Sequence, residues 1–322
     1  MSLSEAADSI NESPAWVERA VEEGLAIPAS AQKPYRFSVA EVHGWTNDIG
    51  ELSRQRVQRN ADGTCAGLSF EPGQYASRHR FILPFVGCWL VTAGGHSKTA
   101  KGRFHNAHCS GAPCERWGCD FGVINSDDHH KCRPGMSRRE LLALRFRRGQ
   151  AENTPDCAIS EPDEEQPWRR VLNPSSCDNR SCYLYGVAIV APADGVVMTC
   201  RGAKEDPEFG ERVRDLSARG ADDEMHLLID HGQGEISALG HVLGRSIQVR
   251  PGQQVRRGQL LCKAGARSGF MSHLHWAVAD GWHPLFAHGL PILISECLVH
   301  NGNTFEKRQN VWLEQGMLVQ NP

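Results

Sequence analysis

Turn-forming residues recur about every 8–12 residues through the second half of the sequence, where they separate short apolar and β-branched runs. The runs include YGVAIV, GVVMTC, MHLLID, EISALG and HLHWAVA. This period leaves no room for a helix between successive strands, so it favours an antiparallel sheet or sandwich over a βα-repeat. We therefore expect a mainly β fold, an antiparallel sheet or sandwich with a few accessory helices.

Two short helices are predicted outside the main strand-rich part. The stretch NESPAWVERAVEEG has Ser13 in position to cap a helix, Pro14 at the first helical position and Gly24 just past the end. The stretch SRRELLALRFRRG begins with Ser137 and Glu140 at the spacing of a capping box.

The same patterns divide the chain into regions. Residues 1–80 are expected to be an N-terminal extension or accessory region, and residues 81–300 the main β domain. A polar, cysteine-containing insertion is expected within that domain at about 125–180, because PDCAISEPDEEQPW is typical of a loop. Residues 301–322 are expected to be a C-terminal tail.

Composition narrows the possible partners. The formal net charge is −3, with 40% hydrophobic and 23% charged residues, which is ordinary for a globular protein. This balance argues against nucleic acid as a partner bound through bulk charge. No apolar run approaches the roughly 18–20 residues that a membrane span needs. The N-terminus also lacks the basic and apolar regions of a signal peptide.

The chain has 12 cysteines, many of them between Cys88 and Cys182 in loop-like sequence. No CxxC pair occurs, and the spacing of Cys109, Cys114 and Cys119 is too open for a zinc ribbon or knuckle. We therefore expect disulfide bonds in an exported protein, periplasmic or extracellular, whose signal peptide is not part of this sequence. The pairing cannot be deduced from the sequence.

Two histidines, His273 and His275, lie two residues apart in the alternating run SGFMSHLHWAVADG. In a strand such residues project from the same face, about 7 Å apart. From the residues alone, this pair is compatible with a metal site, with a catalytic base or with a purely structural role.

The run from HLLIDHGQGEISALGHV through VRPGQQVRRGQLLCKAGARSGFMSHLHWAVADG resembles the catalytic core of the lysostaphin/LytM-type zinc endopeptidases. The resemblance covers about residues 183–295, and order, spacing and residue types agree together. Residues 81–300 are accordingly expected to form a zinc peptidase domain. The part VRPGQQVRRGQLL also resembles biotinyl and lipoyl carrier domains, but no hairpin presents a lysine for modification.

The resemblance implies a zinc site with three protein ligands and an open position for water. It assigns His108 and Asp120, from the segment GGHSKTAKGRFHNAHCSGAPCERWGCDF, together with His275. The two upstream residues stand twelve positions apart, whereas the family's separation is short. His105 and His96 stay open as alternatives to His108.

The family also implies catalytic roles at matching positions. His273 is expected to be the general base on the water and then the proton donor to the leaving amine. His241, in ALGHVLG, is expected to donate a hydrogen bond to the oxyanion, an interaction worth about 2.7–4 kcal/mol. His231 is expected to be a turn residue, and other histidines to be structural or exposed: His129, His130, His226, His283, His288 and His300.

The function that the resemblance implies is a zinc-dependent endopeptidase that cuts peptide bonds in peptidoglycan cross-links or stem peptides. Its partner is then a peptidoglycan peptide or another extracellular peptide, and we expect the insertion at 125–180 to border the substrate groove. The competing hypothesis is a catalytically silent relative that binds peptidoglycan or regulates a cell-wall enzyme. The sequence does not give the bond that is cut or the oligomeric state.

Overall fold

The computed structural model describes residue 2 and residues 77–95, 117–151, 179–201, 226–265, 273–281 and 289–322. The helix expected near Pro14, and nearly all of the N-terminal region 1–80, lie outside these residues. So do His96, His105 and His108. No helix among the described residues has the length and apolar character needed to cross a membrane.

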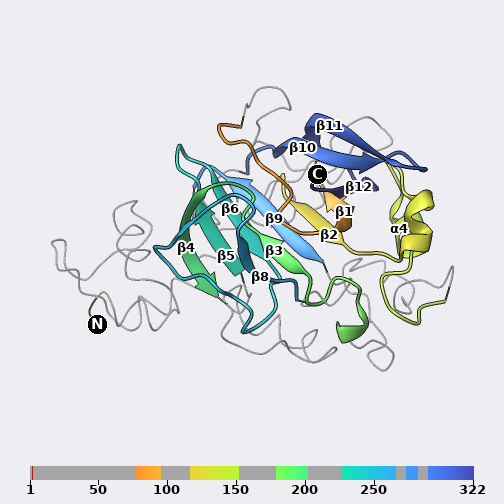
Figure 1. Cartoon of the computed structure of the whole chain (residues 1–322), viewed down its shortest axis with the longest axis horizontal. Coiled ribbons are helices and arrows are strands. Elements are labelled where there is room, and N and C mark those ends of the chain that lie inside the picture. Colours follow the sequence, from red (N-terminus) through yellow and green to blue (C-terminus); the bar gives the residue numbers. More distant parts are fainter. Residues whose placement is uncertain are drawn as a thin grey trace, which may run out of the picture.

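The described residues form a mainly β structure, as the sequence predicts (Figure 1). Ten strands make one sheet whose neighbours are antiparallel, and two more strands make a small antiparallel sheet. In spatial order the large sheet comprises β11 (Phe305–Trp312), β10 (Leu293–His300), β12 (Leu318–Gln320), β1 (Cys88–Gly94), β2 (Cys119–Gly122), β9 (Leu274–Ala279), β6 (Ile236–Gly240), β5 (His226–Asp230), β4 (Gly195–Arg201) and β7 (Gln254–Val255). The small sheet pairs β3 (Ala188–Val190) with β8 (Leu260–Lys263).

The hairpin of β5 and β6 illustrates why the sequence forms these strands. Alternate residues of HLLID are buried, as expected for a strand with one face on the core. The turn that follows contains Gly232 and Gly234 at φ 82° and 76°, a conformation that glycine adopts without strain. His231, at the start of this turn, is buried, in keeping with a structural role.

The main hydrophobic core lies between the large sheet and the small one. Ile189 of β3 and Leu261 of β8 share one buried cluster with residues of the large sheet such as Phe121, Leu239 and Trp276, all of them essentially inaccessible to solvent. Burial of an aliphatic or aromatic side chain of this size stabilises the fold by about 1.5–3 kcal/mol. One face of the strands β2, β6 and β9 is therefore packed against the main core.

A second buried cluster covers the opposite face of the large sheet. Leu90 of β1 and Leu318 of β12 pack there against Leu141, Leu144 and Phe146. These last three belong to the insertion, whose helix α4 (Arg138–Leu142) lies beside β1 and β12 (Figure 1). The capping box of Ser137 and Glu140 is confirmed, but the helix is shorter than SRRELLALRFRRG predicts, because the chain turns to bury Leu144 and Phe146.

The last residues differ from the expected C-terminal tail. Between 301 and 322 the chain supplies β11 and β12, and β12 pairs with both β1 and β10 inside the sheet. Val319 is fully buried in the main core. The signal for this strand in the sequence was the short apolar run MLV within QGMLVQ.

The cysteines also differ from expectation. Seven of them lie among the described residues, and no disulfide bond joins any two of these seven, so the disulfides predicted from the sequence are not found in this part of the chain. Five of the seven are buried, where a thiol packs as a small apolar side chain, so these cysteines have a place in the core without forming disulfides. Burial raises the pKa of Cys88 and Cys132 to about 12, so both stay protonated at neutral pH.

Candidate metal centre

The register of β9 with its two neighbours brings the predicted site residues together. His275 on β9 lies directly opposite Asp120 on β2, and on its other side it lies opposite Gly240 on β6. Residues opposite each other in antiparallel strands project from the same face. Their strand neighbours, Leu274 and Trp276, point into the core instead, so the face that carries Asp120 and His275 is the one away from the main core.

Asp120 makes short contacts with both histidines of the pair. Its Oδ1 atom lies 3.1 Å from Nδ1 of His275 and 3.4 Å from Nε2 of His273. All three side chains are 12–15% exposed, so they are shielded but still reachable from solvent. The pair His273 and His275 thus shares one carboxylate on one face of the strand, as the spacing predicts.

His241 completes the cluster from the end of β6. Its ring centroid lies 4.6 Å from that of His273, edge to face, and 6.2 Å from that of His275. Its backbone has φ 61°, the left-handed region, which costs a residue with a Cβ roughly 1–2 kcal/mol. The structure therefore places His241, His273, His275 and Asp120, predicted from the sequence, in one group.

Gly240 makes room for the cluster, a role that the sequence analysis did not recognise. A methyl group on Gly240 would lie 3.3 Å from Cβ of His275 and 3.7 Å from Cδ2. A larger side chain there would push the His275 ring aside. The signal was the glycine immediately before His241 in ALGHV.

Hydrogen bonds on the core side of β9 fix the strand beneath the site. The indole N–H of Trp276 donates to Oγ of Ser237, 3.1 Å away, and Ser237 Oγ lies 2.8 Å from Nε2 of His231. The other ring nitrogen of His231 donates to the carbonyl of Asp194 at 2.8 Å. Burial lowers the pKa of His231, so the neutral imidazole is favoured there.

The insertion borders the site on the side of β2. Gly122, two residues after Asp120 and on the same face, lies under Phe146, because a methyl group on Gly122 would meet Cε1 of that ring at 2.9 Å. Phe146 thus stands next to the strand position that carries Asp120. Its place beside the site was not evident from the sequence, because Phe146 is far from Gly122 along the chain.

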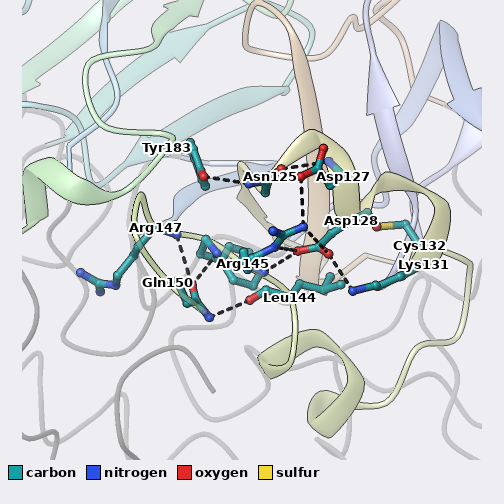
Figure 2. Close-up of polar contacts among 11 residues, drawn as sticks. Asn125, Asp127, Asp128, Lys131, Cys132, Leu144, Arg145, Arg147, Gln150 and Tyr183 are labelled. Atoms are coloured by element: carbon teal, nitrogen blue, oxygen red, sulfur yellow. Dashed lines mark hydrogen bonds and ion pairs between the residues drawn. The ribbon is translucent and has the colours of Figure 1, made fainter. Parts of the chain in front are cut away.

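A buried carboxylate holds this part of the insertion in place (Figure 2). Asp128 accepts hydrogen bonds from the backbone N–H and the guanidinium of Arg145 at 2.9–3.1 Å and from the ammonium of Lys131 at 2.8 Å. Burial alone raises the pKa of Asp128, but these donors outweigh it and hold the pKa well below its ordinary value. Arg145 directly precedes Phe146, so the ion pair positions the ring over Gly122.

The distance between the two described candidate ligand atoms, on Asp120 and His275, is close to the distance that a zinc ion requires. Two ligand atoms about 2.0–2.2 Å from a tetrahedral zinc ion are separated by roughly 3.3–3.5 Å. Oδ1 of Asp120 and Nδ1 of His275 are 3.1 Å apart, close to that separation. A carboxylate oxygen and an imidazole nitrogen are also the donor types that zinc binds.

The third ligand is not among the residues that the structure describes. Within them, no group of three or more histidine, cysteine, aspartate or glutamate side chains is placed to hold a metal ion. The assignment of His108, and its alternatives His105 and His96, therefore stay predictions from the sequence.

Residues 183–286 match the model of Peptidase family M23, so this part of the chain is an M23 peptidase domain. The match contains His241, His273 and His275, but it does not reach Asp120 or the insertion up to position 182. No curated protein matches the chain.

Among solved structures, the chain is similar to a putative peptidase M23 from Pseudomonas aeruginosa, with 30% identity over 38% of this chain and 41% of that one, at a TM-score of 0.21. A zinc-containing peptidase from Vibrio cholerae shares 22% identity over 38% of this chain and 32% of that one, at a TM-score of 0.23. The deep-sea M23 metalloprotease pseudoalterin shares 14% identity over 74% of this chain and 96% of its own, at a TM-score of 0.32. The matched part thus spans less than half of the Pseudomonas and Vibrio proteins.

Proposed function

We propose that this protein is a zinc-dependent endopeptidase that hydrolyses peptide bonds in peptidoglycan cross-links or stem peptides, and that it acts outside the cytoplasm, where that substrate lies. The observation that carries the proposal is the convergence of Asp120, His273 and His275 on one face, with His241 beside them. The M23 match over residues 183–286 supports the class of reaction and substrate.

In this proposal Asp120 and His275 hold the zinc ion, together with His108. When bound, zinc supplies Lewis acidity, which polarises a substrate carbonyl and brings the pKa of a bound water to about 7. Asp120 also lies close to His273 and can orient that imidazole.

In this proposal the two remaining histidines transfer the proton and stabilise the developing negative charge. His273 takes the proton from the attacking water and gives it to the leaving amine. His241 lies with its ring 4.6 Å from that of His273, so it can donate a hydrogen bond to the oxyanion that forms next to the base. Phe146 of the insertion stands beside Asp120 and, in this proposal, bounds the space for substrate on the side of β2.

The proposal predicts about one zinc per purified chain and release of new amino groups from purified peptidoglycan. The variant His275→Ala is expected to lose both, because removing one of three ligands leaves too few to hold the ion. Metal analysis and amine titration measure the two effects. The matched control is His130→Ala, a histidine exposed on the 3-10 helix Ser126–Lys131, which should keep zinc and activity.

The outcome separates the proposal from its main competitor. A wild-type protein that binds peptidoglycan without zinc and without cleavage is a silent relative, and the proposal fails. Full zinc content and cleavage in His275→Ala would also refute the assigned site.

A further inference from the structure

His241 is held in its left-handed conformation by pairing with a neighbouring segment. The amide of Gly265 donates a hydrogen bond to the carbonyl of His241 at 2.9 Å. The next residues continue the pairing, since Val242 and Ala264 form an antiparallel bridge and the amide of Leu243 donates to the carbonyl of Lys263 at 2.8 Å.

Gly265 sits against the backbone of His241 and Val242 with no space for a side chain. A methyl group there would lie 2.8 Å from the carbonyl oxygen of Val242, 2.9 Å from its carbonyl carbon and 3.0 Å from the carbonyl oxygen of His241. All three contacts are with backbone atoms, so rotating a side chain cannot relieve them. The backbone itself would have to move.

The direction of the His241 ring depends on that backbone. A left-handed residue that carries a side chain persists only where its surroundings fix the conformation, and at His241 φ is 61°. The bond from Gly265 and the bridge at Val242 supply that constraint on the C-terminal side. In this conformation the His241 ring lies edge to face with the ring of His273, with the centroids 4.6 Å apart.

We infer that Gly265 is a positioning residue for His241: its amide and its missing side chain set the backbone of His241 and Val242 and thereby aim the imidazole at His273. The inference rests on the proposed function for its catalytic consequence, and on the geometry alone for the placement of the ring.

The chain offers a matched control for general overpacking. Gly195 on β4 is equally crowded, because a methyl group there would meet the carbonyl oxygen of Asp230 at 2.6 Å and the side chains of Ile229 and His231 at 2.8 and 2.9 Å. Gly195 pairs with β7 and makes none of the contacts to His241 described above. Gly195→Ala therefore reproduces the crowding without acting on the His241 backbone.

The kinetic test compares Gly265→Ala and Gly195→Ala on a soluble cross-linked peptide. We expect Gly265→Ala to lower kcat about 10- to 100-fold, as for a misplaced catalytic group, with KM and zinc content little changed. Gly195→Ala acts on His231 on the core side of the sheet, so it is expected to lower the melting temperature and to lower kcat much less than Gly265→Ala does. In a His241→Ala background the added Gly265→Ala should cause no further loss of kcat. Equal losses from the two glycine variants, or an additive loss in that background, would overturn the inference.

A structural readout keeps the inference separate from the proposed function. In zinc-free protein, the imidazole NMR resonances of His241 should shift in Gly265→Ala and stay in place in Gly195→Ala. If the wild type cleaves nothing, the proposed function fails while this comparison still decides the placement. Unshifted His241 resonances in Gly265→Ala would refute it.

A second variant covers the case in which Gly265→Ala does not fold. Oγ of Ser246 donates to the carbonyl of Leu243 at 2.7 Å and accepts from the amide of Lys263 at 3.0 Å, so it ties the same two segments together without crowding. Ser246→Ala should loosen the pairing, lower kcat by roughly threefold and shift the His241 resonances in the same direction. No change in either quantity would contradict the inference.

Discussion

Asp120 is the residue on which the proposed site depends most, because a single carboxylate oxygen lies within 3.4 Å of both His273 and His275. The two histidines nevertheless present different atoms to it, Nδ1 from His275 and Nε2 from His273. We propose different roles for the two, with His275 as a ligand and His273 as the base.

These roles predict that replacing His273 affects activity but not zinc binding. The variant His273→Ala is expected to keep about one zinc per chain and to lose activity by roughly 10²–10⁴-fold, the usual contribution of general acid–base catalysis. Metal analysis and kcat on the same preparation test this. A loss of zinc equal to that of His275→Ala would instead make His273 a ligand.

Only part of this residue-level arrangement could be predicted from the sequence. Alternation placed His273 and His275 on one face, and the family resemblance supplied Asp120 and His241. The left-handed φ of His241 and the close approach of Gly265 could not be predicted, because both arise from the pairing of segments some twenty residues apart.

The insertion contributes directly to the surroundings of the site, because it places Phe146 over Gly122 beside Asp120. Its position depends on the ion pair between Asp128 and Arg145 and on the salt bridge from Lys131 (Figure 2). A buried charge that loses its partners is costly, which makes Asp128 the most sensitive point of the insertion.

We therefore predict that Asp128→Asn destabilises the protein by on the order of 3 kcal/mol at neutral pH, because Arg145 and Lys131 lose a buried counter-charge. Chemical denaturation measures this. The control is Glu140→Gln, an exposed carboxylate of the same insertion, for which little change in stability is expected because solvent screens its charge. Similar losses in the two variants would contradict the special role of Asp128.

The pH dependence of the same pair follows from its pKa. The folded pKa of Asp128 lies below the ordinary value of 3.8, so the unfolded chain takes up the proton first. The stability from this group is full above about pH 4 and is lost as the pH falls further. Asp128→Asn should therefore show a shallower loss of stability in acid than the wild type.

The elements themselves were largely predictable, and the exceptions have physical reasons. Alternation and glycine turns located the strands β4, β5, β6 and β9. The helix α4 ended early because its second half was needed to bury Leu144 and Phe146 against β1. The last strand, β12, was missed because a three-residue strand in the interior of a sheet gives little alternation to detect.

At the scale of the whole molecule, the two faces of the large sheet have different roles. One face carries the main core with the small sheet β3–β8, and the other carries the cluster of Asp120 and the histidines together with the insertion. Because β9 lies inside the sheet, the backbone at His275 is paired on both sides, with Asp120 of β2 and with Gly240 of β6. Such a rigid support suits a site in which small displacements reduce activity.

Anomalous scattering at the zinc absorption edge, from crystals of the wild-type protein, locates the ion and its ligands in one measurement. The proposal predicts one peak per chain, about 2.0–2.2 Å from both Oδ1 of Asp120 and Nδ1 of His275. A zinc-soaked crystal with no peak there, or with zinc bound elsewhere in the molecule, would contradict the proposed metal centre.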